Sequence, residues 1–144
     1  MSKMEASFTG PKPPVILLLE DDENDVLLFH HAVAQAGYTG AVRAFGDVTE
    51  AQSYVETVCV YPDATYFRRP RLIVSDCQLA GHSTSEFIAW MRAQPLFADI
   101  PVVMLSGTAK KMEQGWPAQI GVTAFISKTG NIPALASALR PWLP

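Results

Sequence analysis

Five side chains that could hold a cation or a phosphoryl group stand at or just beyond the ends of four short apolar segments. They are Glu20 and Asp21 after 15–19, Asp76 after 72–75, Ser106 after 102–105 and Lys128 after 124–127. Carboxylate oxygens are the ligands that Mg²⁺ prefers, and a lysine ammonium can neutralise phosphoryl oxygens. A carboxylate that faces such groups can attack phosphorus and form an acyl phosphate. The residue types therefore predict a site for a divalent cation and a phosphoryl group.

The three carboxylates need a counter-charge if their segments are neighbours. At an effective dielectric of about 20, two carboxylates roughly 4 Å apart repel each other by about 4 kcal/mol. Mg²⁺ typically takes one or two carboxylates plus water, so Glu20, Asp21 and Asp76 are the expected metal residues. Lys128 adds a further positive charge, and Gly107 after Ser106 leaves room for a ligand to approach the backbone.

The segments that carry these residues alternate between short strands and longer amphipathic helices. Ala41–Phe45 is expected as a further, weaker strand. The expected helices lie after Asp21 up to Gly37, from Asp47 to about Val60, over Phe87–Ala93, over about 109–120, and from Asn131 and Pro133 to Pro141. This alternation predicts a doubly wound (βα)5 sandwich of the flavodoxin-like type, with a five-stranded parallel sheet. The carboxyl ends of all five strands then share one edge, where such folds bind ligands.

Two helix starts carry specific signals. Asp47 is a suitable N-cap for the second helix. Ser83-Thr84-Ser85-Glu86 fits a capping box that opens the Phe87–Ala93 helix. The helix over 109–120 is interrupted by Gly115 and Pro117, which makes its prediction the least secure.

Length and composition indicate one globular domain. The chain has 144 residues, is 49% hydrophobic and carries a net charge of −3. There is no long basic run, which argues against direct nucleic-acid binding, and no apolar run long enough to cross a membrane. We expect 1–14 to be a disordered lead-in and 15–144 to be the single domain. Cys59 and Cys77 have no metal-site spacing, so we expect them to be small buried side chains in a reducing cytoplasm.

Four motifs, in this order and spacing, resemble the receiver domains of two-component response regulators over essentially all of Val15–Leu143. The motifs are Leu-Leu-Leu-Glu20-Asp21-Asp22, Leu-Ile-Val-Ser-Asp76, Pro-Val-Val-Met-Leu-Ser106-Gly-Thr-Ala and Ala-Phe125-Ile-Ser-Lys128. The resemblance is to stand-alone regulators of the chemotaxis type. The long connection before the Asp76 strand and Lys128-Thr129 are also similar to regulators that serve phytochrome-type kinases.

The resemblance implies a role for each matching residue. Asp76 would be the phosphoacceptor, and Ser106 and Lys128 would bind the phosphoryl group. Mg²⁺ would be held by Glu20, Asp21, Asp76 and the backbone carbonyl of Gln78. Ser106 and Phe125 would move together as the switch, and Gln78 and Thr108 would tune hydrolysis of the acyl phosphate.

The chain departs from the family pattern in the loop after Asp76 and after Lys128. Ala80 stands where proline is usual, and glycine is usual near Thr84, so the backbone of Leu79–Ser85 is expected to be altered. Thr129 replaces a proline with a cis peptide bond, so this bond is expected to be trans. Phe125 replaces the commoner tyrosine, and a core aromatic is a real alternative to its switch role. Asp22, Glu23 and Asp25 are best interpreted as acids that favour a helix N-terminus.

Three functions are compatible with these residue types. The leading one is a phosphorelay module that is itself no enzyme beyond its own phosphorylation and dephosphorylation. A sensor histidine kinase or a histidine phosphotransfer protein would be its donor, and a downstream protein its target. A homodimer is a further partner that the resemblance allows. The alternative is a pseudo-receiver that binds its partner without phosphorylation. A phosphatase of the haloacid-dehalogenase type is disfavoured, because Gln78 stands where its second Asp is needed.

Overall fold

The computed structural model describes residues 12–62, 68–80, 82–107 and 121–144. Its centre is a five-stranded parallel sheet in the order β2-β1-β3-β6-β7. The strands are β1 (Val15–Leu19), β2 (Ala41–Phe45), β3 (Leu72–Asp76), β6 (Val102–Ser106) and β7 (Ala124–Ser127). This sheet confirms the predicted fold, including the weak strand over 41–45.

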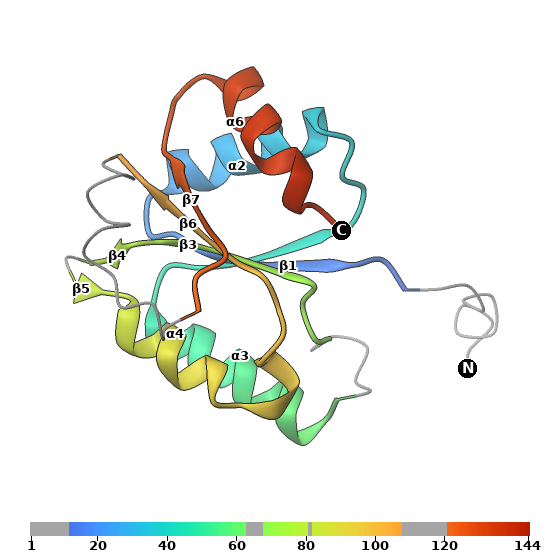
Figure 1. Cartoon of the computed structure of the whole chain (residues 1–144), viewed down its shortest axis with the longest axis vertical. Helices are drawn as coiled ribbons and strands as arrows, with labels where there is room; N and C mark the ends of the chain where they lie inside the picture. The colour runs from blue at the N-terminus through green and yellow to red at the C-terminus, as the bar shows by residue number, and fades with distance from the viewer. Residues whose placement is uncertain (1–11, 63–67, 81, 108–120) are drawn as a thin grey trace.

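Helices cover both faces of the sheet (Figure 1). One face carries α2 (Glu23–Gln35) and α6 (Ile132–Leu139), and the other carries α3 (Val48–Val60) and α4 (Ser85–Arg92). Two short 3-10 turns follow α4 and α6, at Pro95–Phe97 and Arg140–Trp142. The helix expected over 109–120, and most of the lead-in expected over 1–14, lie outside the described residues. The division into lead-in and domain stays a prediction.

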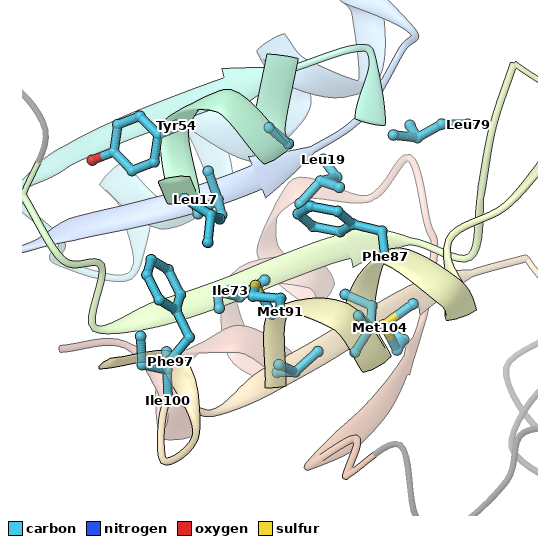
Figure 2. Close-up of a cluster of buried hydrophobic side chains, with 14 of the residues drawn as sticks. Leu17, Leu19, Tyr54, Ile73, Leu79, Phe87, Met91, Phe97, Ile100 and Met104 are labelled. Carbon is cyan, nitrogen blue, oxygen red and sulfur yellow. The ribbon is translucent and has the colours of Figure 1, made fainter. Parts of the chain in front are cut away.

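Alternating strand residues pack into two separate hydrophobic cores, one on each face of the sheet, because successive side chains of a strand point to opposite faces. Leu17, Leu19 and Ile73 pack against α3 and α4, where Phe87 and Met91 complete the cluster shown in Figure 2. Ile16, Leu18, Leu72 and Val74 pack on the other face against α2 and α6. The continuous apolar segments in the sequence therefore reflect burial on both faces of a parallel sheet.

Most of the predicted helix boundaries are confirmed. Asp47 accepts a hydrogen bond from the N–H of Thr49 at the start of α3, and Asn131 accepts one from Ala134 at the start of α6. Gly37 follows α2 with a φ of 94°, a conformation that favours glycine. α6 ends at Leu139, and Pro141 lies in the 3-10 turn that follows it. In the described part of the chain, no helix is long and apolar enough to span a membrane.

The capping box over 83–86 is wrong. α4 begins at Ser85, and its N-cap is Thr84, whose side chain makes no capping bond. Thr84 is fully buried, and its hydroxyl donates instead to the carbonyl of Asp76, at 2.9 Å. A tertiary hydrogen bond that closes the loop after β3 therefore displaces the local cap that the sequence favours.

Candidate phosphoryl and metal site

Strand register brings the predicted site residues to one edge of the sheet. Asp76 is the last residue of β3, opposite Leu105 of β6, and Ser106 ends β6 opposite Ser127 of β7. The N–H of Lys128 continues the ladder by donating to the carbonyl of Ser106, at 2.8 Å. Glu20 likewise extends β1, because its N–H donates to the carbonyl of Phe45, at 3.0 Å. These carboxyl ends lie together at the left of Figure 1.

The ammonium of Lys128 forms ion pairs with three carboxylates of the site. Its Nζ lies 2.7 Å from Glu20 Oε1, 2.8 Å from Asp25 Oδ2 and 2.9 Å from Asp76 Oδ2. Burial by itself lowers the pKa of Lys128, but its hydrogen bonds to Asp25, Glu20 and Asp76 outweigh that effect and leave the pKa raised. Lys128 is therefore held firmly in its charged form beside Asp76.

Asp25 is a member of this cluster that the sequence analysis missed. It was assigned only to the helix N-terminus, together with Asp22 and Glu23. Asp22 does cap α2, accepting from the N–H groups of Asn24 and Asp25. Asp25 is then the third residue of the helix, a position whose side chain reaches back towards the cap. An N-cap at Asp22 puts Asp25 in the first turn of the helix, directly after the end of β1. That position is close to the sheet edge where Lys128 lies, and it is the signal in the sequence that could have identified Asp25.

Glu20 is nearly inaccessible, with 4% of its surface exposed. Burial raises the pKa of Glu20, and this effect outweighs the opposing contributions of Lys128 and of the N–H of Asp22, which donates to Oε2 at 3.1 Å. The carboxylate is thus held in place by one ammonium and one backbone donor. Its position depends on Lys128 because burial of an unpaired carboxylate is strongly unfavourable.

Three carboxylates come close enough to share a cation. One ligand oxygen each from Glu20, Asp21 and Asp76 lie within 4.8 Å of one another. Glu20, Asp25 and Asp76 pair with the Lys128 ammonium, and Asp21 adds a fourth carboxylate close to Glu20 and Asp76. The donor set is all oxygen and the negative charge is in excess, which fits a hard dication such as Mg²⁺.

Asp21 is exposed and is oriented by the loop after β3. Its Oδ2 accepts a hydrogen bond of 3.0 Å from the backbone N–H of Ala80. That loop is a small hairpin formed by β4 (Gln78–Leu79) and β5 (His82–Ser83). Ala80 adopts a φ of 50°, within the left-handed region. The backbone of this loop is thus set by a conformation that proline, with its fixed negative φ, cannot adopt.

The remaining predicted site residues differ in how far their side chains are exposed to solvent. Ser106 is buried, whereas Gln78 is exposed and its N–H lies 3.4 Å from Asp76 Oδ1. Phe125 is half-buried opposite Met104 and packs against the core shared with α3 and α4. The peptide bonds of the described residues, including the one after Lys128, are all trans. Thr108 lies outside the described residues.

Comparisons of sequence give a consistent set of relatives. No family model matches the chain. The polar-differentiation response regulator DivK of Brucella anthropi is 29% identical over 107 residues, which cover 71% of this chain and 86% of DivK. DivK of Brucella ovis is 28% identical over the same length.

Solved structures of response regulators and of a receiver domain are similar to this chain in fold. The phosphorylated cyanobacterial phytochrome response regulator RcpA is 27% identical, with a TM-score of 0.71 over 90% of each chain. The chemotaxis regulator CheY4 of Vibrio cholerae is 22% identical, with a TM-score of 0.71 over 92% of this chain and 100% of CheY4. The receiver domain of the sensor histidine kinase PA1611 of Pseudomonas aeruginosa, solved with magnesium in its active site cleft, is 21% identical, with a TM-score of 0.67 over 90% of this chain and 97% of its own. The last two establish similarity of fold.

Proposed function

Because this chain is a response regulator receiver domain, we propose that it accepts a phosphoryl group on the carboxylate of Asp76. The observation that carries the proposal is the 2.9 Å contact between Asp76 Oδ2 and the Lys128 ammonium, beside an excess of carboxylates. Asp76 ends a buried strand, so its carboxylate is presented at the rim of the sheet rather than within the core.

The chemistry assigned to these residues is a transfer between two nucleophiles. The phosphoryl donor would be a phosphohistidine of a sensor kinase or of a phosphotransfer protein. An Asp76 oxygen attacks phosphorus and the bond between phosphorus and the imidazole nitrogen breaks, with its electron pair returning to nitrogen. Because the other ring nitrogen of the phosphohistidine carries a proton, the imidazole leaves as the neutral ring. The product is an acyl phosphate, which water later hydrolyses to restore Asp76.

Electrostatic support for the transfer would come from charged and polar groups near Asp76. Lys128 would move its ammonium from the carboxylate onto a phosphoryl oxygen, and the Ser106 hydroxyl would donate to another. Glu20, Asp21, Asp76 and the carbonyl of Gln78 would hold Mg²⁺, which when bound neutralises phosphoryl oxygens. Gln78 and Thr108 would tune the access of water to the acyl phosphate.

Phosphorylation would then be communicated by a change in packing. We assign the switch to Ser106, at the end of β6, and Phe125, on the neighbouring strand β7. Phe125 packs partly against the core beside α3 and α4, so its rotation would change the surface next to β7. The output is a contact with a downstream protein or with a second copy of the chain. We place this activity in the cytoplasm, in keeping with the free thiols of Cys59 and Cys77.

The decisive experiment is incubation with acetyl phosphate and Mg²⁺, followed by intact mass measurement. Wild type should gain one phosphoryl group, and Asp76→Asn should gain none while keeping its circular dichroism spectrum. Asp99→Asn is a matched control, because it removes an exposed carboxylate away from the site and should label like wild type. Equal labelling of Asp76→Asn would contradict the assignment. A folded wild type that is never labelled would favour a pseudo-receiver that binds partners constitutively.

A further inference from the structure

A second charged feature lies at the opposite edge of the sheet, where β1 begins. A cavity of about 270 Å³ is lined by Pro13, Pro14 and Val15 together with four cationic side chains, those of Lys12, Arg68, Arg69 and Arg71. None of the described residues that line this amino-edge cavity carries a carboxylate. The start of β1 lies towards the right of Figure 1, whereas the carboxyl ends of the strands lie at the left.

The wall of the amino-edge cavity is held in place by hydrogen bonds. The carbonyl of Pro13 accepts from the Arg68 guanidinium, at 2.7 Å, and the carbonyl of Pro14 accepts from the N–H of Ala41, at 2.9 Å. The Tyr38 hydroxyl also lies 2.7 Å from the Pro14 carbonyl. A side chain at Gly40 would clash with that carbonyl, so glycine is needed for this close approach. The wall is therefore an ordered part of the fold.

The cations at the rim are positioned but not neutralised by the rest of the described chain. Arg69 donates from Nε to the carbonyl of Leu96, which leaves its two terminal nitrogens for other partners. Arg71 is anchored through its backbone, because its N–H donates to the carbonyl of Val15. Within the described ranges, no carboxylate forms an ion pair with Lys12 or with the three arginines.

We propose that the amino-edge cavity docks an acidic segment of a partner protein. Guanidinium groups match carboxylates in bidentate geometry, and three of them around one hollow suit successive Asp or Glu side chains. The chain as a whole carries a net charge of −3, which disfavours the phosphate backbone of a nucleic acid, whereas a short peptide senses mainly the local charge.

This surface goes beyond the proposed phosphorylation and does not depend on it. The cavity lies at the start of β1, and Asp76 lies at the end of β3, so docking leaves the phosphoryl site open. A partner held there is bound constitutively, and binding to Asp76→Asn is expected to equal binding to wild type. Failure of the docking proposal therefore leaves the proposed function intact, and the reverse also holds.

The test is an NMR titration of isotope-labelled full-length protein with a short peptide of alternating Asp and Glu. Saturable shifts are expected at the amides of Val15, Arg69 and Arg71. Because each exposed ion pair contributes modestly, Arg71→Gln should weaken binding roughly threefold, and the double variant with Arg69→Gln roughly tenfold. Arg140→Gln removes an equal charge from a residue outside the cavity lining and should bind like wild type. Raising the salt concentration should weaken binding.

Three outcomes would overturn the proposal. Binding that is unchanged in the double variant would show that the peptide binds elsewhere. Inorganic phosphate that produces the same shifts with the same affinity would identify a site for small anions rather than for a protein segment. A short DNA duplex that binds more tightly than the peptide would reassign the surface to nucleic acid.

Discussion

The backbone N–H of Ala80 donates a hydrogen bond of 3.0 Å to Oδ2 of Asp21, and it does so from a left-handed conformation with a φ of 50°. The hairpin after β3 is thereby tied to a carboxylate at the end of β1. Donors that orient a metal-binding carboxylate strengthen the site, because the ligand then loses less freedom when it binds. A proline at this position could supply neither the N–H nor the positive φ.

We therefore expect two substitutions at Ala80 to differ in their effect on Mg²⁺ affinity. Ala80→Pro should weaken Mg²⁺ binding by about tenfold or more, as measured by calorimetry, because it removes the donor that orients Asp21. Ala80→Gly keeps the N–H and relieves the left-handed backbone, so Mg²⁺ affinity should stay and the free energy of unfolding should rise by up to about 1 kcal/mol. If both variants lost affinity equally, the hydrogen bond would not be the cause.

Asp25→Asn should release one of the three carboxylates that hold Lys128. The pKa of Lys128 should fall, because that ion pair helps to raise it. The free energy of unfolding should decrease by about 1 kcal/mol, the upper range for a partly exposed ion pair. NMR titration of the Lys128 side chain and urea unfolding would measure the two effects. Glu23→Gln removes a neighbouring acid of the same helix turn, and it should leave the Lys128 pKa unchanged; a fall in that variant too would point to general charge rather than contact.

Thr84 and Ser83 offer a direct test of which residue secures the loop before α4. Thr84→Val removes a fully buried hydroxyl that donates to the Asp76 carbonyl, and should lower the free energy of unfolding by about 1–2 kcal/mol. Ser83→Ala removes an exposed hydroxyl and should change it by about 0.5 kcal/mol or less. Urea unfolding of both variants is the measurement. A larger loss in Ser83→Ala would restore the capping box.

Tyr38 should make stability fall at alkaline pH. Burial raises the pKa of its hydroxyl from 10.0 to about 12, although the charges of Arg68 and Arg71 oppose this rise. A folded-state pKa above the unfolded value means that the contribution of the neutral hydroxyl is complete below pH 10 and is lost as the pH rises to about 12. Tyr38→Phe should therefore show a smaller decline in unfolding free energy over this window. Tyr61→Phe, at an exposed position, is the control and should keep the wild-type slope.

Strands and helix caps were predictable where one local signal dominated. The segments 15–19 and 72–74 are continuous apolar runs, which are typical of strands in a sheet buried on both faces. Asp47 and Asn131 cap their helices through local hydrogen bonds, from the N–H groups of Thr49 and Ala134. Ser83 is not the N-cap of α4. Thr84 occupies that position, and its hydroxyl donates to the Asp76 carbonyl, a contact eight residues away in sequence that the capping pattern does not predict.

The sequence by itself predicted a parallel sheet with Glu20, Asp76, Ser106 and Lys128 at its carboxyl edge, since strands that alternate with helices run parallel. Only the tertiary structure decided which groups touch there. Asp25 reaches Lys128, and Ala80 reaches Asp21, because helix α2 and the β4–β5 hairpin pack over that edge at specific angles. Those angles depend on how the cores on both faces fill, and such contacts between residues distant in sequence leave no periodic signal in the chain.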